Sequence, residues 1–137
     1  MKIEGFSLYR YRLPLNRTLV LRSASIIERE GLLIRFSSDN GKMGWGEIAP
    51  LPGFSDERLA DAAEQTSAIA RKLVGSPIPK DLNEIDRALA DTSTAMYPSV
   101  RCGIEGALLH LHAEIDGRTI RFTDRTDTPS NVPLNGL

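Results

Sequence analysis

The chain has 137 residues, with 17 Lys or Arg against 18 Asp or Glu, and a formal net charge of −1. Nucleic acids and anionic membranes bind clustered Lys and Arg, so a near-neutral chain without a basic run predicts neither partner. No apolar stretch is long enough to span a membrane, and the N-terminus lacks the pattern of a secretory signal. Together with a single cysteine, Cys102, these features favour a reducing, cytoplasmic location.

The first third of the chain has the alternation of β-strands. Apolar residues recur at every second position in residues 9–13 and 32–36, which predicts two strands with one face on a core. Residues 14–25 between them are expected to form a loop, and loops of that length are usually functional or disordered. The pair Asn40-Gly41 predicts a type I′ hairpin, after which residues 43–48 return as an antiparallel third strand.

The apolar period then changes to that of helices. The first predicted helix is capped by Ser55 and stopped by Gly75, the second covers residues 82–90 behind Asp81, and the third covers residues 98–117. Strands followed by helices indicate an α+β fold. The apolar stripes of the helices predict a shared core that contains Leu59, Ile69, Leu73, Ile104, Leu108 and Leu111.

Residues with reactive side chains are few. On a helix, His110 and His112 point about 200° apart and cannot hold one metal ion together, so one imidazole is expected at the core edge and one in solvent. Cys102 is expected to be a buried structural thiol, and residues 28–30 (Glu-Arg-Glu) a solvated strand end. No catalytic residue and no metal ligand is expected in this chain.

One segment is more specific. Residues 44–55, Gly-Trp-Gly-Glu-Ile-Ala-Pro-Leu-Pro-Gly-Phe-Ser, resemble the enolase superfamily (mandelate racemase/muconate lactonizing enzyme-like), and within it most of all the o-succinylbenzoate synthases of menaquinone biosynthesis. Residues 28–33, 99–105 and 132–137 match in the same order. The matches at residues 99–105 and 132–137 are shared with N-succinylamino acid racemases, muconate cycloisomerases and dipeptide epimerases. A cap of one of these enzymes therefore stays as an alternative, as does a stand-alone non-catalytic binding module.

The resemblance implies a domain organisation. Residues 1–122 correspond to an enolase N-terminal capping domain, a three-stranded antiparallel meander followed by a helical bundle. Residues 123–131 correspond to a linker, and residues 132–137 to the start of the first strand of a β/α barrel that is absent here. In this family the barrel holds Mg²⁺ with three carboxylates and supplies a lysine pair, and this chain has no Lys-x-Lys motif. The 137 residues alone are therefore expected to be inactive.

The resemblance also implies where substrate is met. In the family two loops of the cap close over the barrel mouth, and they correspond here to residues 14–25 and 49–55. Contact with a small dicarboxylate substrate is expected from Leu19, Arg22, Leu51 and Phe54. For Arg22 a solvated loop position is the alternative, and for Phe54 a staple onto the first helix. The expected partners are the chain's own C-terminal barrel and the substrate, and a homo-oligomer is left open.

Overall fold

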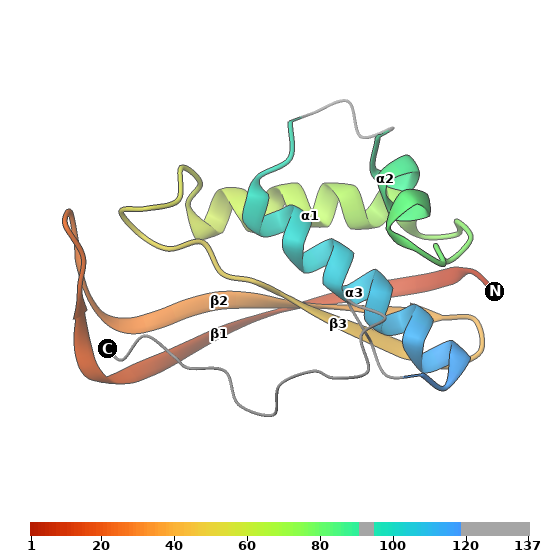
Figure 1. The fold of residues 1–137 in the computed structure, drawn as a ribbon, viewed down its shortest axis with the longest axis horizontal. Helices are drawn as coiled ribbons and strands as arrows, with labels where there is room; N and C mark the ends of the chain where they lie inside the picture. The colour runs from red at the N-terminus through yellow and green to blue at the C-terminus, as the bar shows by residue number, and fades with distance from the viewer. Residues whose placement is uncertain (91–94, 119–137) are drawn as a thin grey trace, which may run out of the picture.

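A computed structural model describes residues 1–90 and 95–118 of the chain. Three antiparallel strands in the order β1-β2-β3 precede three helices, as Figure 1 shows, which confirms the predicted α+β class. The elements are β1 (Ile3–Val20), β2 (Ser25–Ser38), β3 (Met43–Ile48), α1 (Leu59–Leu73), α2 (Leu82–Ala90) and α3 (Pro98–Asp116). The predicted linker 123–131, the predicted barrel strand 132–137 and the domain boundary at 122 lie outside the described residues.

The first two strands form a much longer hairpin than the sequence pattern predicts. Pairing runs from Ile3 on β1 to Val20, which faces Ser25, so the expected loop over residues 14–25 is wrong and only residues 21–24 form the turn. The register shifts between Pro14 and Leu19. Proline lacks an N–H for the ladder and is tolerated on an edge strand such as β1 or at an irregularity. Pro14, Asn16 and Thr18 indicate a loop from composition, and the segment lacks the alternation of a strand because this part of the hairpin is mostly exposed.

The turn between β2 and β3 also differs from the prediction. Gly41 has a φ of +80°, and no other residue type in the described part of the chain has a positive φ. A type I′ turn needs positive φ at both central positions, so that assignment is wrong. Instead the Gly41 N–H donates to the Ser38 carbonyl oxygen at 2.9 Å, and the Ser38 N–H donates to the Lys42 carbonyl oxygen at 3.0 Å. The third strand itself is confirmed over the predicted residues.

Helix α1 begins later than predicted. Its N-cap is Arg58, whose backbone N–H is bonded at 3.2 Å to the Asp61 carboxylate, and Ser55 lies outside the helix. Ser55 is occupied elsewhere, because its hydroxyl accepts the Leu51 N–H at 2.9 Å and closes a local turn. The predicted end is confirmed, since Gly75 follows the helix with a φ of +86°.

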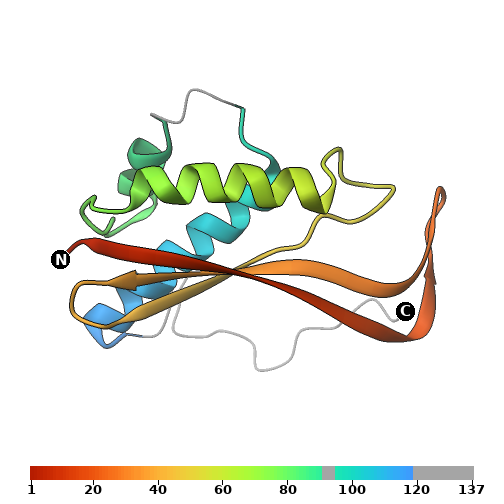
Figure 2. The same ribbon diagram turned by 180° about the vertical axis from the view of Figure 1, so that it is seen from behind.

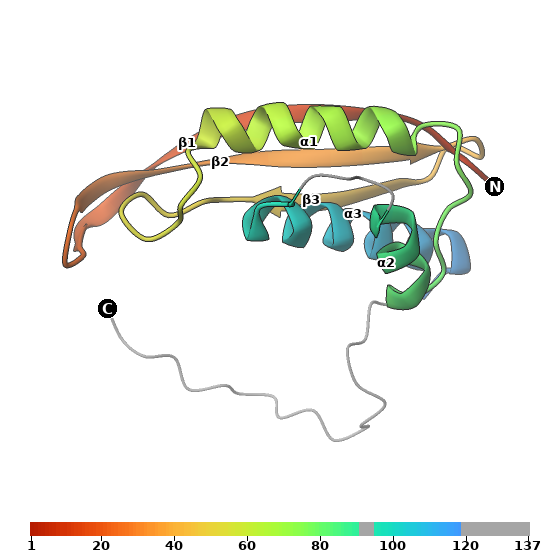
Figure 3. The ribbon, with the colours of Figure 1, turned by 90° about the horizontal axis from the view of Figure 1, so that it is seen from above.

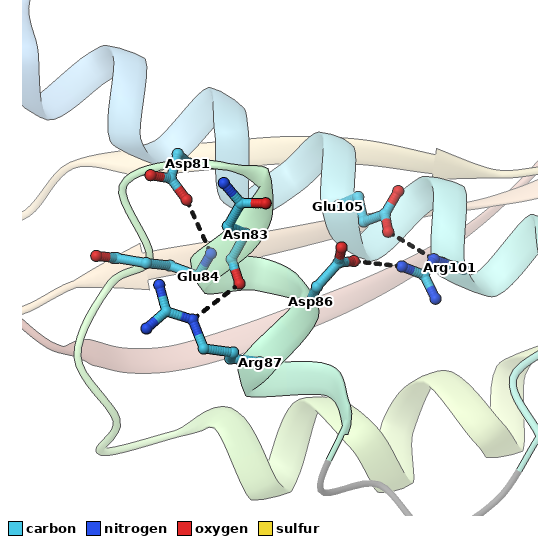
Figure 4. Close-up of polar contacts among 7 residues, drawn as sticks. All are labelled: Asp81, Asn83, Glu84, Asp86, Arg87, Arg101 and Glu105. Carbon is cyan, nitrogen blue, oxygen red and sulfur yellow. Dashed lines mark hydrogen bonds and ion pairs between the residues drawn. The ribbon is translucent and has the colours of Figure 1, made fainter.

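Polar contacts define α2 and join it to α3 (Figure 4). The Asp81 carboxylate accepts the Glu84 N–H at 2.8 Å, which confirms Asp81 as the cap of α2. Arg101 of α3 forms an ion pair with Asp86 of α2 and a second one, at 2.6 Å, with Glu105 one turn along its own helix. Helix α3 begins at Pro98 and ends before Gly117, as predicted.

The core lies between the helices and one face of the sheet. Leu32, Ile34 and Phe36, alternate residues of β2, are almost completely buried and cluster with apolar residues of all three helices. Figure 3, a view from above, shows α1 along β1 and β2 and α3 along β3. Of the predicted core residues, Ile69, Leu73, Ile104, Leu108 and Leu111 are buried, and Leu59 packs against them partly exposed.

Helix α3 approaches the edge strand β3 so closely that side chains are excluded. A Cβ atom added to Gly46 would lie 1.9 Å from the Gly103 carbonyl oxygen, and one added to Gly44 would lie 2.2 Å from that of Ala107. Between the two glycines the Trp45 N–H donates to His110 Nδ1 of α3 at 3.1 Å. The two glycines of the Gly-Trp-Gly pattern therefore allow the backbones of β3 and α3 to come into contact, and this contact positions α3 on the sheet. In the part of the chain that the structure describes, no helix is long and apolar enough to cross a membrane.

Candidate functional site

Two turns that are far apart in the sequence meet at one end of the molecule. One is the hairpin turn, residues 21–24 between β1 and β2, and the other is the β3–α1 loop, residues 49–58. Figures 1 and 2 place both at the end of the sheet opposite the N-terminus. The Ser23 hydroxyl donates to the Gly53 carbonyl oxygen at 2.9 Å and joins them directly.

Three of the four residues predicted to contact substrate, Arg22, Leu51 and Phe54, lie on these two segments, and Leu19 lies at the end of β1 just before the hairpin turn. Arg22 is exposed in the hairpin turn, and Phe54 in the β3–α1 loop is 83% exposed. Leu19 and Leu51 are half-buried, Leu19 within β1 rather than in a loop. The bond between Ser23 and Gly53 connects the residue after Arg22 to the residue before Phe54. The alternative role of Phe54 as a helix staple is wrong, because a staple would be covered by the helix it fixes.

Sequence reasoning missed a third participant, Arg29 of β2. Its guanidinium is partly buried and donates to two successive carbonyl oxygens of the β3–α1 loop, that of Ala49 at 3.2 Å and that of Pro50 at 3.4 Å. The expectation that residues 28–30 form a solvated strand end is therefore wrong for Arg29. The available signal was that Arg29 lies amid a strand pattern, where a charged residue needs a partner.

The neighbouring acidic residues lie beside arginines of β1. Glu30 accepts hydrogen bonds from Arg12 at 2.8 Å and Arg10 at 3.0 Å, which lower its pKa, and Glu28 lies 3.4 Å from Arg12. These groups are close to a cavity of about 370 Å³ under the β3–α1 loop. Its lining includes four carboxylates and one arginine, and consists of Glu28, Glu30, Pro50, Pro52, Gly53, Ser55, Asp56, Glu57, Arg58 and Leu59. An anionic substrate is not favoured in such a cavity, so we place the candidate contact surface at the exposed turns instead.

The other face of the hairpin carries a tyrosine with a perturbed acidity. The Tyr11 hydroxyl is hydrogen-bonded to the Glu47 carboxylate and lies over Gly31, where an added Cβ would be 2.3 Å from the hydroxyl oxygen. Burial first, and then the hydrogen bond and negative charge of Glu47, raise the pKa of Tyr11 to about 12. Tyr11 is therefore a neutral donor near pH 7 and fixes Glu47 at the end of β3.

The remaining reactive residues lie away from this end. His110 and His112 are both half-buried, so the expected solvated imidazole is wrong; His110 accepts the Trp45 N–H, and His112 lies 3.3 Å from Asp116. Cys102 is exposed rather than buried, since two residues along a helix turn a side chain to the face opposite Val100. Within residues 1–90 and 95–118, no three His, Cys, Asp or Glu side chains are arranged to hold a metal ion.

Comparison with known proteins gives consistent results. The family model described as MenC, N-terminal domain, matches residues 3–111. The o-succinylbenzoate synthase of Haemophilus influenzae is 51% identical over 65 residues, which cover 47% of this chain and 19% of that protein. The o-succinylbenzoate synthase of Photorhabdus laumondii is 35% identical over 109 residues, which cover 80% of this chain and 29% of that protein. The chain thus spans less than a third of the length of these relatives.

Solved structures share the fold. A dipeptide epimerase from Methylococcus capsulatus, complexed with Mg and the dipeptide L-Arg-D-Lys, superposes with a TM-score of 0.73 at 26% identity, over 85% of this chain and 33% of that one. An N-succinyl Arg/Lys racemase from Bacillus cereus gives a TM-score of 0.72 at 23% identity, over 80% of this chain and 29% of that one. The family match covers everything from β1 into α3. The chain therefore belongs to the MenC N-terminal domain family and has the fold of the enolase-superfamily N-terminal domain.

Proposed function

We propose that this chain is the capping domain of an o-succinylbenzoate synthase-like enzyme, which dehydrates a cyclohexadiene dicarboxylate in menaquinone biosynthesis. Family membership and the named relatives support the proposal. The observation that carries it is the junction of the hairpin turn and the β3–α1 loop through Ser23 and Gly53. That junction presents an exposed cation, Arg22, and an exposed aromatic ring, Phe54, from one end of the domain.

In this proposal the chain binds and shields substrate and leaves the chemistry to a barrel. Arg22 binds a substrate carboxylate by a charge-assisted hydrogen bond. Phe54 and Leu51 exclude water from the barrel mouth, which strengthens electrostatic interactions inside. Dehydration also requires removal of a proton α to a carboxylate, and we propose that the barrel supplies the lysines and the Mg²⁺ for it. The described residues of this chain do not fit a Mg²⁺ site, because no cluster of three candidate ligands occurs among them.

A related activity is the second candidate. The epimerase from Methylococcus capsulatus is 26% identical and superposes over most of the chain, so a cap that serves a racemase or an epimerase has structural support. The cap fold is shared, and the barrel carries the groups that decide the reaction. We also propose a cytoplasmic location, supported by the single cysteine.

The test is to determine the reading frame beyond the codon for Leu137, express the full product and assay two reactions side by side. We expect Mg²⁺-dependent dehydration of the cyclohexadiene precursor to exceed racemisation of N-succinylamino acids. Racemisation without dehydration contradicts the synthase assignment and supports the second candidate. A stop codon directly after Leu137 contradicts both and favours a stand-alone binding module.

A further inference from the structure

We propose that Arg29 and Ser23 are positioning residues that lock the β3–α1 loop onto the β1–β2 hairpin, so that the two substrate-facing turns move as one body. The inference rests on the proposed function for its catalytic consequence. Neither residue contacts substrate in this proposal. They act through the loop that carries Leu51 and Phe54.

Arg29 connects β2 to the β3–α1 loop where the backbone pairing of the sheet ends. The β2–β3 ladder stops at the pair Leu32 and Ile48, and extending its register would place Arg29 opposite Leu51. Backbone pairing does not continue there, and Pro50 has no N–H to donate. The guanidinium donates instead to the Ala49 and Pro50 carbonyl oxygens, at 3.2 and 3.4 Å. A planar fork with several fixed donors suits two successive carbonyls, which a lysine ammonium matches less well.

Ser23 makes the second attachment at the far side of the loop. Its hydroxyl donates to the Gly53 carbonyl oxygen at 2.9 Å. Gly53 has a φ of +76°, and an added Cβ would lie 2.9 Å from the Ser23 hydroxyl and 3.1 Å from the Ala24 methyl group. The hairpin turn is therefore packed on the loop as well as hydrogen-bonded to it, and a side chain at Gly53 would push the two apart.

The loop is also closed by hydrogen bonds among its own residues. The Phe54 and Ser55 N–H groups both donate to the Leu51 carbonyl oxygen, at 3.0 and 2.8 Å, and the Leu51 N–H donates to the Ser55 hydroxyl at 2.9 Å. A small closed turn moves as a unit. Among the described residues, the side-chain hydrogen bonds that reach residues 49–54 from outside the loop come from Arg29 and Ser23. The position of Phe54 thus depends on both.

The first experiment measures amide hydrogen exchange in the 137-residue chain. The reporters are the N–H groups of Leu51, Phe54 and Ser55 in the loop and of Leu21, which donates to the Ala24 carbonyl oxygen in the hairpin turn. We expect Ser23→Ala to speed exchange in the loop about fivefold, as a lost neutral hydrogen bond would, and Arg29→Met to speed it about tenfold or more and also at Leu21, since hydrogen bonds of a charged group are stronger. The Ile85 N–H in α2 should keep its rate.

Matched controls distinguish the loss of the Arg29 and Ser23 attachments from a general loosening of the hairpin. Ser25→Ala removes an exposed serine of the same hairpin, and Arg17→Met removes an exposed arginine of β1. In the described part of the chain, neither side chain is hydrogen-bonded to the loop. Both controls should leave loop exchange unchanged. Equal exchange rates in the parent chain, Ser23→Ala and Arg29→Met overturn the proposal that these residues hold the loop. So does an Arg29→Met effect that stays in the loop and never reaches Leu21.

The second experiment measures kinetics in the full product. We expect Arg29→Met to raise KM for the dicarboxylate about tenfold with a smaller change in kcat, and Arg29→Lys to recover part of the loss. Wild-type protein without activity contradicts the proposed function and leaves the exchange result standing. Active wild type, with faster loop exchange but unchanged KM and kcat in Arg29→Met, overturns the positioning role alone.

Discussion

The Ser23 hydroxyl lies 2.9 Å from the Gly53 carbonyl oxygen, across thirty residues of sequence. Gly53 owes its place in this contact to a left-handed backbone, which few other residues adopt without strain. The contact joins the two segments that are predicted to face substrate. A cap that met its substrate through two independent loops would have to order each of them separately on binding, and a joined pair avoids part of that entropic cost.

A first prediction concerns the contact of α3 with β3. Gly103→Ala should destabilise the domain by about 1–3 kcal/mol, because overpacking a tight contact costs that much. The new methyl group would lie 2.2 Å from Ile48 and 2.8 Å from the Glu47 carbonyl oxygen. Urea unfolding followed by circular dichroism measures the change.

The matched control for this change is on the same helix. Gly106→Ala adds a methyl group whose nearest neighbour is 4.0 Å away, so it should stabilise the helix by about 0.5–1 kcal/mol through propensity alone. Similar effects of the two substitutions would contradict the close approach of α3 to the sheet.

A second prediction concerns high pH. The pKa of Tyr11 is raised from its ordinary value of 10.0 to about 12, so the folded state keeps a proton that the unfolded state loses between these values. The stabilisation is complete below pH 10, falls as pH rises and is gone above pH 12. Ultraviolet titration of tyrosinate should show a last step near pH 12 that Tyr11→Phe removes. Glu47→Gln should move that step downward, and a step that stays in place would contradict the role of Glu47.

The sequence predicted the parts of the fold that repeat a period against the core. The strand at β3 and the helices α2 and α3 agree with their predicted bounds because burial of one face imposes a strict spacing. The outer half of the β1–β2 hairpin was missed because it extends beyond the helices and, apart from the buried Ile26, its residues are exposed or only partly buried. Long-range strand pairing, rather than local pattern, holds it.

The sequence predicted the two segments that form the candidate site, but it did not predict the hydrogen bonds that join them. Arg22 and Phe54 were named from the resemblance, and both are exposed at the junction. Ser55 has the composition of a cap, but its hydroxyl competes for the Leu51 N–H, and the helix starts four residues later. The charge of Arg29 predicted a solvated position. Its carbonyl partners are contributed by the backbone, which leaves no trace in residue types.

A third prediction concerns Mg²⁺. A hard cation needs several convergent oxygen ligands, and the described residues offer no such cluster. Titration calorimetry of the 137-residue chain with Mg²⁺ should therefore give no heat beyond dilution, whereas the full product should bind. Micromolar affinity in the chain alone would contradict the assignment of the metal to the barrel.

The last prediction tests Arg22 in the full product. Arg22→Ala should raise KM for the dicarboxylate about tenfold or more, since the lost interaction is a hydrogen bond between charged groups. If Arg22 only binds a carboxylate distant from the reacting carbon, kcat changes little; if it also holds the closed cap in place, kcat falls as well. Arg17→Ala, an exposed arginine of the same hairpin, controls for the loss of one positive charge. Higher salt should weaken substrate binding in the parent more than in Arg22→Ala, because screening acts on an exposed charge. Kinetics identical to the parent at low salt would place Arg22 in solvent and leave substrate contact to Phe54 and Leu51.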